Sequence, residues 1–191
     1  MALRKVEGLL EAGANVLVVA PQVVDMPAGV TVIRRPVRLA DLDEVVLAVC
    51  ASGDAAANAA LASEAHRRGV LVNVVDDPEA GTFTVPAVLR RGRLQVAVST
   101  GGASPLLARR LRDELAGQVD DDYAALVDLL AELRRAWEPR AVAAGVAPAA
   151  RRAAWQAVLD LPLLDLLHRG DSGKARSRAA AVLEDALARS D

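Results

Sequence analysis

The 191-residue sequence predicts an α/β protein in which a parallel β-sheet is followed by a β-hairpin and an all-helical C-terminal region. Apolar, β-branched runs alternate with helical patterns over residues 2–75, and this alternation is typical of a parallel sheet covered on both faces. Two further strand-like runs are separated only by Arg91 and Gly92, which indicates a hairpin. From about residue 117 onward, apolar residues recur at helical spacing alone.

The N-terminal part of the sequence supplies two helices and several strands. Residues 2–12 have apolar positions at helical spacing and are followed by Gly13, which favours a helix end. Asp54 is a candidate N-cap and Gly69 a stop signal for an alanine-rich helix over residues 55–68. The expected strands, all short and apolar, are residues 15–20, 30–37, 44–51 and 70–75.

The predicted hairpin strands are residues 83–90 and 93–100. Pro86 has no backbone N–H, so we expect it at an edge or a bulge of the first strand. Ser104 and Pro105 then open a helix, because serine suits the N-cap and proline the first helical position.

The C-terminal region is expected to be a group of helices. Pro139 should break or kink the first of them, and Trp137 and Trp155 are predicted to be core anchors. Further helices are expected near residues 148–160, 161–169 and 174–189. The sequence is therefore divided into three segments, residues 1–78, 79–116 and 117–191.

The composition excludes several classes of protein. A net charge of −2 offers no basic surface for a nucleic acid, and a single cysteine, Cys50, rules out a disulfide framework. The two histidines, His66 and His168, belong to no metal-binding motif, so no metal site is expected. The sequence has neither a signal peptide nor an apolar run long enough for a membrane span, which predicts a cytoplasmic protein without a membrane partner.

Dinucleotide-binding sheets of the Rossmann type begin with a strand, a glycine-rich turn and a helix whose N-terminus binds the pyrophosphate. Residues 2–12 take the place of that helix and residues 15–20 that of the next strand, but the first strand and the glycines are missing. Because the first strand is central, we expect an N-terminally truncated sheet with an open position between residues 15–20 and 44–51. Our hypothesis is that the natural protein carries that strand and loop ahead of Met1. The alternative is that the chain is a degenerate relative of such dinucleotide-binding proteins.

A candidate catalytic group lies at the carboxyl end of the last predicted parallel strand. Asn73 is followed there by Asp76, Asp77 and Pro78. Ligands bind at this edge of open α/β sheets, and a carboxylate there can accept a proton or orient a substrate. The alternative is that Asp76 or Asp77 only caps the turn before Pro78.

The strongest local motif is Ser-Thr-Gly-Gly-Ala-Ser-Pro at residues 99–105. Paired glycines let a ligand approach the backbone closely, and the helix N-terminus offers free N–H donors to an anion. Charge-assisted bonds could come from nearby arginines, namely Arg90, Arg91, Arg93 and Arg109. The alternative is a well-capped helix after a glycine turn, with these arginines in solvent.

Together with the segment Ala2-Leu3-Arg4-Lys5, these motifs resemble the precorrin-2 dehydrogenase family, the N-terminal part of sirohaem synthases. The resemblance covers most of residues 2–115. It implies NAD-dependent oxidation of the tetrapyrrole precorrin-2 to sirohydrochlorin, on the route to sirohaem, by a homodimer. On this basis residues 1–78 are a truncated Rossmann-like NAD-binding domain, residues 79–116 a dimerisation and substrate segment, and residues 117–191 a helical domain.

The resemblance also implies roles for particular residues. Asp76 is the implied catalytic residue. The implied cofactor-binding residues are Met1, Pro21, Gln22, Ala51 and Ser52. The implied substrate-binding residues are Asn73, Thr100, Gly101, Gly102 and Ser104.

Other functions stay open at this point. The strand that runs into Pro21 and Gln22 carries no acid for a ribose hydroxyl, so the residues alone do not decide between NAD and NADP; the resemblance implies NAD. Ferrochelatase activity, which some relatives have, is not expected with two histidines and no metal cluster. The competing function is that of a non-catalytic, tetrapyrrole-binding or regulatory relative that has lost its cofactor loop.

Overall fold

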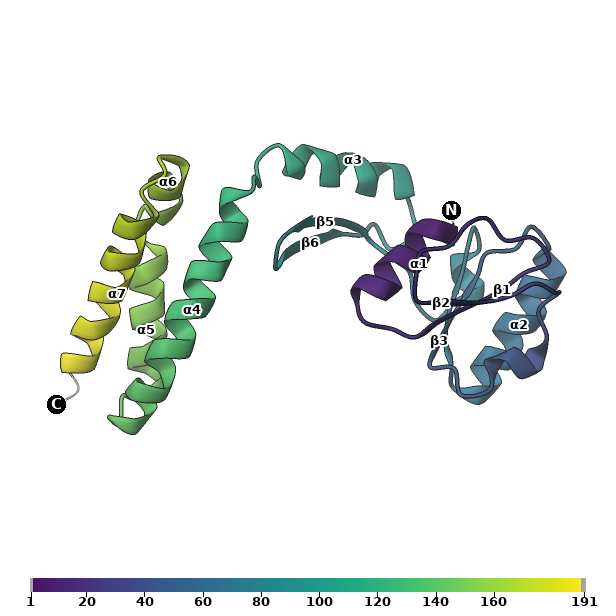
Figure 1. Ribbon diagram of the computed structural model, residues 1–191, viewed down its shortest axis with the longest axis horizontal. Helices are drawn as coiled ribbons and strands as arrows, with labels where there is room; N and C mark the ends of the chain where they lie inside the picture. The colour runs from purple at the N-terminus through teal and green to yellow at the C-terminus, as the bar shows by residue number, and fades with distance from the viewer. Residues whose placement is uncertain (1, 190–191) are drawn as a thin grey trace. The chain divides into compact units, whose positions relative to one another are not determined.

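The computed structural model describes residues 2–189 and divides into two compact units, Met1–Val85 and Pro86–Asp191. We call them the N-terminal unit and the C-terminal unit (Figure 1). The architecture is the expected mixed α/β one, with small parallel sheets first and helices last. The predicted role of Met1 in cofactor binding lies outside the described residues. The finer division of the sequence at residues 78 and 116 stays a prediction.

The N-terminal unit contains two parallel strand pairs. Strand β1 pairs with β2, with Val16 opposite Val30, and β3 pairs with β4, with Leu47 opposite Leu71. Each strand has four residues and is shorter than the apolar run that predicts it. In chain order the elements are α1 (Ala2–Glu11), β1 (Val16–Val19), β2 (Val30–Ile33), η1 (Leu39–Leu42), β3 (Leu47–Cys50), α2 (Ala55–Arg68), β4 (Leu71–Val74) and η2 (Pro78–Ala80).

Strands β1 and β3 face an open position and do not pair with each other. Within residues 2–189, no hydrogen-bonded ladder joins the two strand pairs. A cavity of about 590 Å³ lies between them, lined by both strands and by Lys5, Val6 and Leu9 of α1. The open position that the sequence predicts is therefore present, and the sheet consists of two halves.

Local signals in the sequence fix the ends of α2. The Asp54 carboxylate accepts a hydrogen bond from the Ala57 N–H at 3.0 Å, and Gly69 ends the helix with a φ of 71°. Helix α2 packs on β3 and β4, where Ala62 and Ala65 are buried (Figure 1). The half-sheet of β3 and β4 thus has a core of its own on one face.

An ion pair between Arg35 and Asp41, a residue of η1, sets the ionisation of Asp41. The Arg35 guanidinium donates to the two Asp41 carboxylate oxygens at 2.7 and 2.5 Å, and the Arg38 N–H donates at 2.8 Å. The bonds from Arg35, opposed by burial and assisted by the Arg38 N–H, lower the pKa of Asp41 to about 2.

This shift predicts a pH-dependent contribution to stability. A carboxyl group whose pKa is depressed in the folded state stabilises it above the unfolded pKa, and the contribution is lost as the pH falls through the folded value. The difference in free energy of unfolding between the wild type and Asp41→Asn should therefore shrink between about pH 4 and pH 2. Circular-dichroism unfolding curves across this range check the prediction; a difference that stays constant down to pH 2 contradicts it.

The C-terminal unit joins an antiparallel hairpin to a series of helices. The hairpin turns at Gly92, whose φ of 53° suits glycine, and its first strand starts after Pro86, which cannot donate to the ladder. Ser104 caps the next helix by accepting from the Leu107 N–H at 3.2 Å, as predicted. The elements are β5 (Ala87–Arg91), β6 (Leu94–Val98), α3 (Pro105–Ala116), α4 (Asp122–Ala143), α5 (Pro148–Leu159), α6 (Leu163–His168) and α7 (Ser172–Ala188).

Helix α4 continues through Pro139 to Ala143, so of the predicted break or kink at Pro139 the break is wrong. Trp137 and Ala141, on either side of this proline, are 2% and 0% exposed. Packing of this buried face outweighs the single backbone hydrogen bond that proline removes.

The two tryptophans are core anchors, as the sequence predicts. Helices α4, α5 and α7 run side by side (Figure 1), and the Trp137 Nε1–H donates to the Leu183 carbonyl of α7 at 2.7 Å. Trp155 of α5 lies edge-on to Trp137 with ring centroids 6.0 Å apart. The indoles therefore join three helices into one core.

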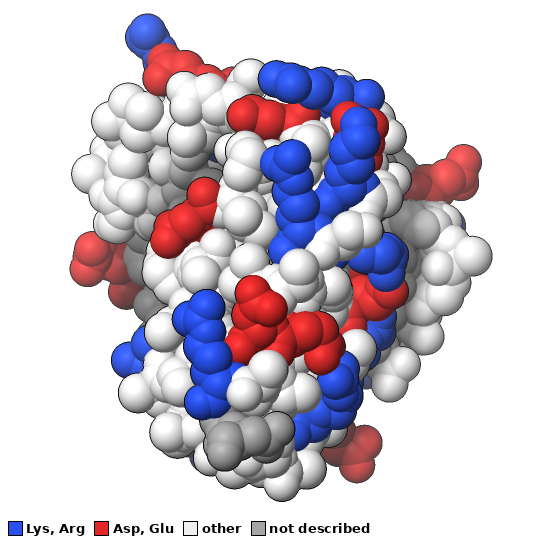
Figure 2. Space-filling view, turned by 90° about the vertical axis from the view of Figure 1, so that its left-hand side faces the viewer, with Lys and Arg blue, Asp and Glu red and all other residues white. Residues whose placement is uncertain are grey.

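The surface of the helical region alternates in charge. Figure 2 shows basic and acidic side chains next to one another on this face. Arg140 donates to both carboxylate oxygens of Glu184 at 2.6 and 2.7 Å, and Arg176 pairs in the same way with Glu132. Among the helices of residues 2–189, none combines the length and the apolar character that a membrane span needs.

Candidate active site

Asp76 lies two residues beyond β4, at the edge formed by the carboxyl ends of the parallel strands in the N-terminal unit. Its φ is 65°, and Glu44 is the only other non-glycine residue of residues 2–189 with a positive φ. The residue is exposed, and its carboxylate makes no hydrogen bond or ion pair within the described part of the chain. A strained backbone that presents an unpartnered carboxylate at a ligand-binding edge is typical of a functional position.

Asn73 supports this edge from inside. It is 6% exposed and is the only buried polar residue among residues 2–189. Its Oδ1 accepts from the Lys5 ammonium at 2.7 Å, and its Nδ2–H donates to the Phe83 carbonyl at 3.0 Å. Burial lowers the pKa of Lys5. The Asn73 side chain thus ties α1, β4 and the segment after Asp76 together, instead of standing free for a substrate.

Replacement of Asn73 by Ala should destabilise the N-terminal unit by about 1–3 kcal/mol, because it leaves the Lys5 ammonium and the Phe83 carbonyl without partners. Both tryptophans lie in the C-terminal unit, so hydrogen exchange of the β4 amides is the suitable measurement. Asn58→Ala is the matched control, because the bonds of Asn58 to Ser52 are exposed to solvent. Equal β4 exchange in the two variants would contradict a supporting role of Asn73.

The residues predicted to bind the cofactor lie at the carboxyl ends of β1 and β3. Pro21, Gln22, Ala51 and Ser52 are all exposed. Ala51 and Ser52 also line the cavity between β1 and β3. The Ser52 hydroxyl donates to Asn58 Oδ1 at 2.6 Å, which holds the loop against the start of α2. Because these four residues are exposed, a ligand can reach this edge of the sheet.

The start of α1 also suits a dinucleotide. Its first turn contains no acidic residue, and Arg4 and Lys5 bring positive charge to the helix N-terminus. A helix N-terminus with nearby cations stabilises a pyrophosphate. The residues present therefore fit a nicotinamide dinucleotide at this edge, although the described residues include no glycine-rich loop ahead of α1.

The predicted substrate loop belongs to the C-terminal unit. Gly101 and Gly102 have φ values of 61° and 88°, which only glycine adopts readily. The Thr100 hydroxyl accepts from the Ser104 N–H at 2.9 Å, and the Ser99 hydroxyl accepts from the Gly101 N–H at 3.2 Å. Thr100 and Ser104 therefore shape the loop, while the Gly102 backbone is open to a ligand.

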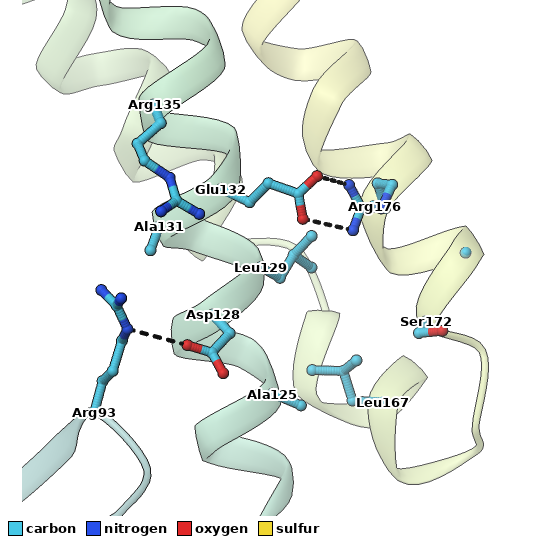
Figure 3. Close-up of a pocket in the computed structure, with 11 residues that line it drawn as sticks. Arg93, Ala125, Asp128, Leu129, Ala131, Glu132, Arg135, Leu167, Ser172 and Arg176 are labelled. Atoms are coloured by element: carbon cyan, nitrogen blue, oxygen red, sulfur yellow. Dashed lines mark hydrogen bonds and ion pairs between the residues drawn. The ribbon is translucent and has the colours of Figure 1, made fainter.

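Arg90, Arg91 and Arg93, three of the four candidate arginines, interact with other groups of the chain. Arg91 donates to the Val119 carbonyl at 3.1 Å, and Arg93 lies 3.4 Å from the Asp128 carboxylate. Arg93 and Asp128 border a pocket of about 480 Å³ that also contains the Glu132–Arg176 pair (Figure 3). Arg135 adds a third guanidinium to these two ion pairs, so the lining of the pocket carries one positive charge in excess.

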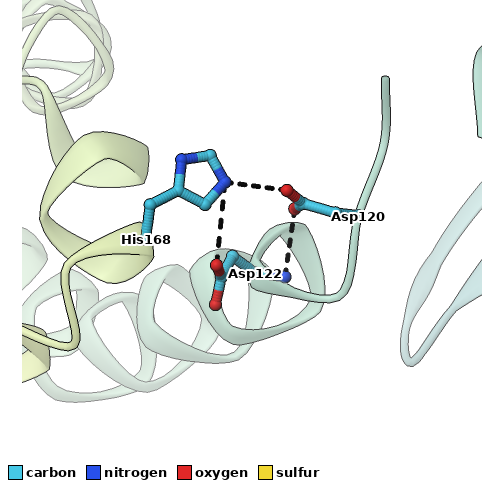
Figure 4. A group of neighbouring side chains, drawn as sticks. All are labelled: Asp120, Asp122 and His168. Atoms are coloured by element: carbon cyan, nitrogen blue, oxygen red, sulfur yellow. Dashed lines mark hydrogen bonds and ion pairs between the residues drawn. The ribbon is translucent and has the colours of Figure 1, made fainter. Parts of the chain in front are cut away.

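The structure brings together three titratable side chains, Asp120, Asp122 and His168, whose proximity their spacing in the sequence did not indicate. His168 Nε2 lies 2.8 Å from Asp120 Oδ2 and 3.6 Å from Asp122 Oδ2 (Figure 4). The pKa of Asp120 lies below its usual value. Burial alone would raise this pKa, but the hydrogen bond and charge of His168 and two backbone N–H groups together outweigh the effect of burial. Carboxylates and an imidazole are metal ligands, yet these groups already satisfy one another and fasten the start of α4 to the end of α6.

Two family models match the sequence. Residues 1–87 match a family described as "Putative NAD(P)-binding". Residues 91–118 match a family described as "Sirohaem biosynthesis protein central". The two matched segments contain every residue to which the resemblance assigns a role.

Several known proteins are similar to this chain. The siroheme synthase of Chromobacterium violaceum is 40% identical over 183 residues, which is 93% of this chain and 38% of that protein. The siroheme synthase of Methylococcus capsulatus is 38% identical over 197 residues, which is 100% of this chain and 40% of that protein. The chain thus spans about two fifths of the length of these relatives. Among solved structures, "SirC, precorrin-2 dehydrogenase" has a TM-score of 0.70 and 27% identity, covering 96% of this chain and 89% of that one.

Proposed function

The chain belongs to the sirohaem-biosynthesis family that includes these siroheme synthases, and from this premise we propose that it is an NAD-dependent precorrin-2 dehydrogenase. The observation that carries the proposal is Asp76, an exposed and unpartnered carboxylate with a φ of 65° at the ligand-binding edge of a nucleotide-binding fold. The similar solved structure, named as a precorrin-2 dehydrogenase, supports the same activity.

The reaction removes one hydride and one proton from precorrin-2 and leaves sirohydrochlorin. When bound, the nicotinamide ring provides the hydride acceptor. The chain has to hold the macrocycle and receive the proton. Asp76 receives this proton in the proposal, since a carboxylate at this edge can act as a general base and return the proton to solvent. Asn73 acts on the reaction only through the position of β4 and the segment after it.

The substrate is a polycarboxylate, and the loop before α3 suits such a ligand. The exposed Gly102 backbone lies next to the N-terminus of α3. Helix α3 also carries exposed apolar side chains, and the exposed fractions of Leu106, Leu107 and Leu111 are 72%, 47% and 38%. An apolar helix face of this kind supports the homodimer that the family resemblance implies.

The test is to incubate the chain with precorrin-2 and with NAD or NADP at millimolar concentrations. We expect sirohydrochlorin and reduced nicotinamide in equal amounts, with NAD as the better substrate. Binding of precorrin-2 without any reduction of the nicotinamide would instead support the non-catalytic, tetrapyrrole-binding alternative. Absence of both reduction and binding would contradict both functions.

A further inference from the structure

We infer that the pocket bordered by the β5–β6 turn, α4 and the start of α7 binds a small organic carboxylate, held between the guanidiniums of Arg93 and Arg135. The whole pocket lies within the C-terminal unit. The inference rests on the charges, the apolar lining and the size of this pocket. It does not depend on the proposed function.

Arg135 brings an unpaired positive charge to the pocket. Within the described part of the C-terminal unit, its guanidinium makes no hydrogen bond or ion pair. The bond from Arg176 lowers the pKa of Glu132 against the effect of burial, and the charge of Arg135 adds to this lowering. Figure 3 shows the guanidiniums of Arg135 and Arg93 on the same side of α4. An anion that enters there can receive charge-assisted hydrogen bonds from both.

Arg93 can exchange its present partner for a ligand. Its Nε lies 3.4 Å from Asp128 Oδ1, and the two side chains are 66% and 65% exposed. An exposed ion pair with one long contact contributes little to stability. A ligand carboxylate can accept two parallel N–H bonds from the guanidinium, so it can replace Asp128.

The hairpin turn holds the backbone of Arg93 close to α4. The Arg91 Nε–H donates to the Val119 carbonyl, just ahead of α4, at 3.1 Å. A Cβ placed on Gly92 would lie 3.1 Å from the Ala124 Cβ, so the turn approaches the helix more closely than a side chain there would easily allow. This backbone is therefore in place before a ligand binds, which lowers the entropic cost of binding.

The rest of the pocket suits the hydrocarbon part of a small molecule. Its apolar lining consists of Ala125, Leu129 and Ala131 of α4 and Leu167 of α6. The volume of about 480 Å³ lies in the lower part of the range of roughly 300–1,000 Å³ that is usual for ligand pockets. A ligand with one ring or a short chain therefore fits better than a macrocycle.

The net charge of the lining favours a carboxylate over a phosphate. Three guanidiniums and two carboxylates leave an excess of one positive charge, which one carboxylate neutralises. A phosphate monoester carries nearly two negative charges at neutral pH. Its second charge would be repelled by Asp128 and Glu132, which border the same pocket.

The experiment titrates the chain with 3-phenylpropionate, which joins one carboxylate to one ring. Binding is followed by NMR at the Nε–H signals of Arg93 and Arg135 and at the methyl signals of Leu129 and Leu167. We expect saturation with a Kd of about 1 mM or tighter, as is usual for a ligand of this size. The neutral analogue 3-phenylpropanamide and inorganic phosphate should each bind at least about tenfold more weakly.

Three variants test the assignment of the carboxylate to the two arginines. Arg135→Gln should weaken binding of 3-phenylpropionate at least about tenfold. Arg134→Gln is the matched control, because it removes the same charge from the adjacent residue, whose guanidinium lies outside the pocket and 5.0 Å from the centre of the Trp155 ring. Its Kd should stay within about twofold of wild type. Asp128→Asn should tighten binding about threefold or more, because it frees Arg93.

Equal losses in Arg135→Gln and Arg134→Gln would overturn the inference, since only the total charge of the protein would then matter. Signals that do not saturate would also overturn it, as would equal binding of the amide or of phosphate. If Arg135→Gln disturbs the amide spectrum of the C-terminal unit, Asp128→Asn decides. Tighter binding by that variant supports the inference, and unchanged or weaker binding overturns it. No measurement here requires catalytic activity, so a failure leaves the proposed function untouched.

Discussion

Replacement of Asp76 by Asn is expected to lower kcat for precorrin-2 oxidation by about 100-fold or more, with little change in the Kd for the nicotinamide. The amide cannot accept a proton, although it has nearly the same shape as the carboxylate. Asn also tolerates the left-handed region, so the φ of 65° can be kept. Single-turnover formation of sirohydrochlorin and titration with the nicotinamide measure the two quantities separately.

Asp77→Asn is the matched control for this prediction. The Asp77 carboxylate accepts from the Ala80 N–H at 3.2 Å and so caps the short helix η2. An asparagine oxygen can accept the same bond, so turnover should stay within about threefold of wild type. If Asp76→Asn turns over as fast as this control, Asp76 has no part in proton transfer and only shapes the turn.

The elements that the sequence predicts well depend on neighbouring residues. Asp54, Gly69 and Ser104 act on backbone groups within four residues of themselves, and each ends or begins its helix as expected. The open position next to β1 was predictable for the same reason, since the order of apolar runs and helical patterns is a local property. The continuation of α4 through Pro139 was not predictable, because burial of Trp137 and Ala141 against other helices decides the course of this helix.

The candidate site shows the same difference between features set by neighbouring residues and features set by distant ones. Asp76 and the glycine loop could be found from the sequence because each lies in a short motif at the end of a strand. Lys5 could not, since its partner Asn73 is 68 residues away. His168 and Asp120 are 48 residues apart and meet only because α6 returns to the start of α4. Contacts between distant residues need the packed fold, and no local spacing encodes them.

Truncation of Trp137 to Ala is expected to have the largest effect on stability, a loss of about 3–5 kcal/mol for the C-terminal unit. The side chain is 2% exposed, and its removal leaves a cavity among α4, α5 and α7. It also leaves the Leu183 carbonyl without the Nε1–H donor at 2.7 Å. Denaturant unfolding followed by the fluorescence of Trp155 measures the loss, because the chain has only these two tryptophans.

Two variants separate the contributions of volume and of the hydrogen bond. Trp137→Phe keeps most of the buried ring but loses the bond to the Leu183 carbonyl, so it should cost about 1–3 kcal/mol. Trp155→Ala should cost less than Trp137→Ala, because the Trp155 indole is only partly buried and its Nε1–H donates to the Glu138 carboxylate near the surface. An equal or larger loss for Trp155→Ala would mean that α5, and not α4, supplies the centre of this core.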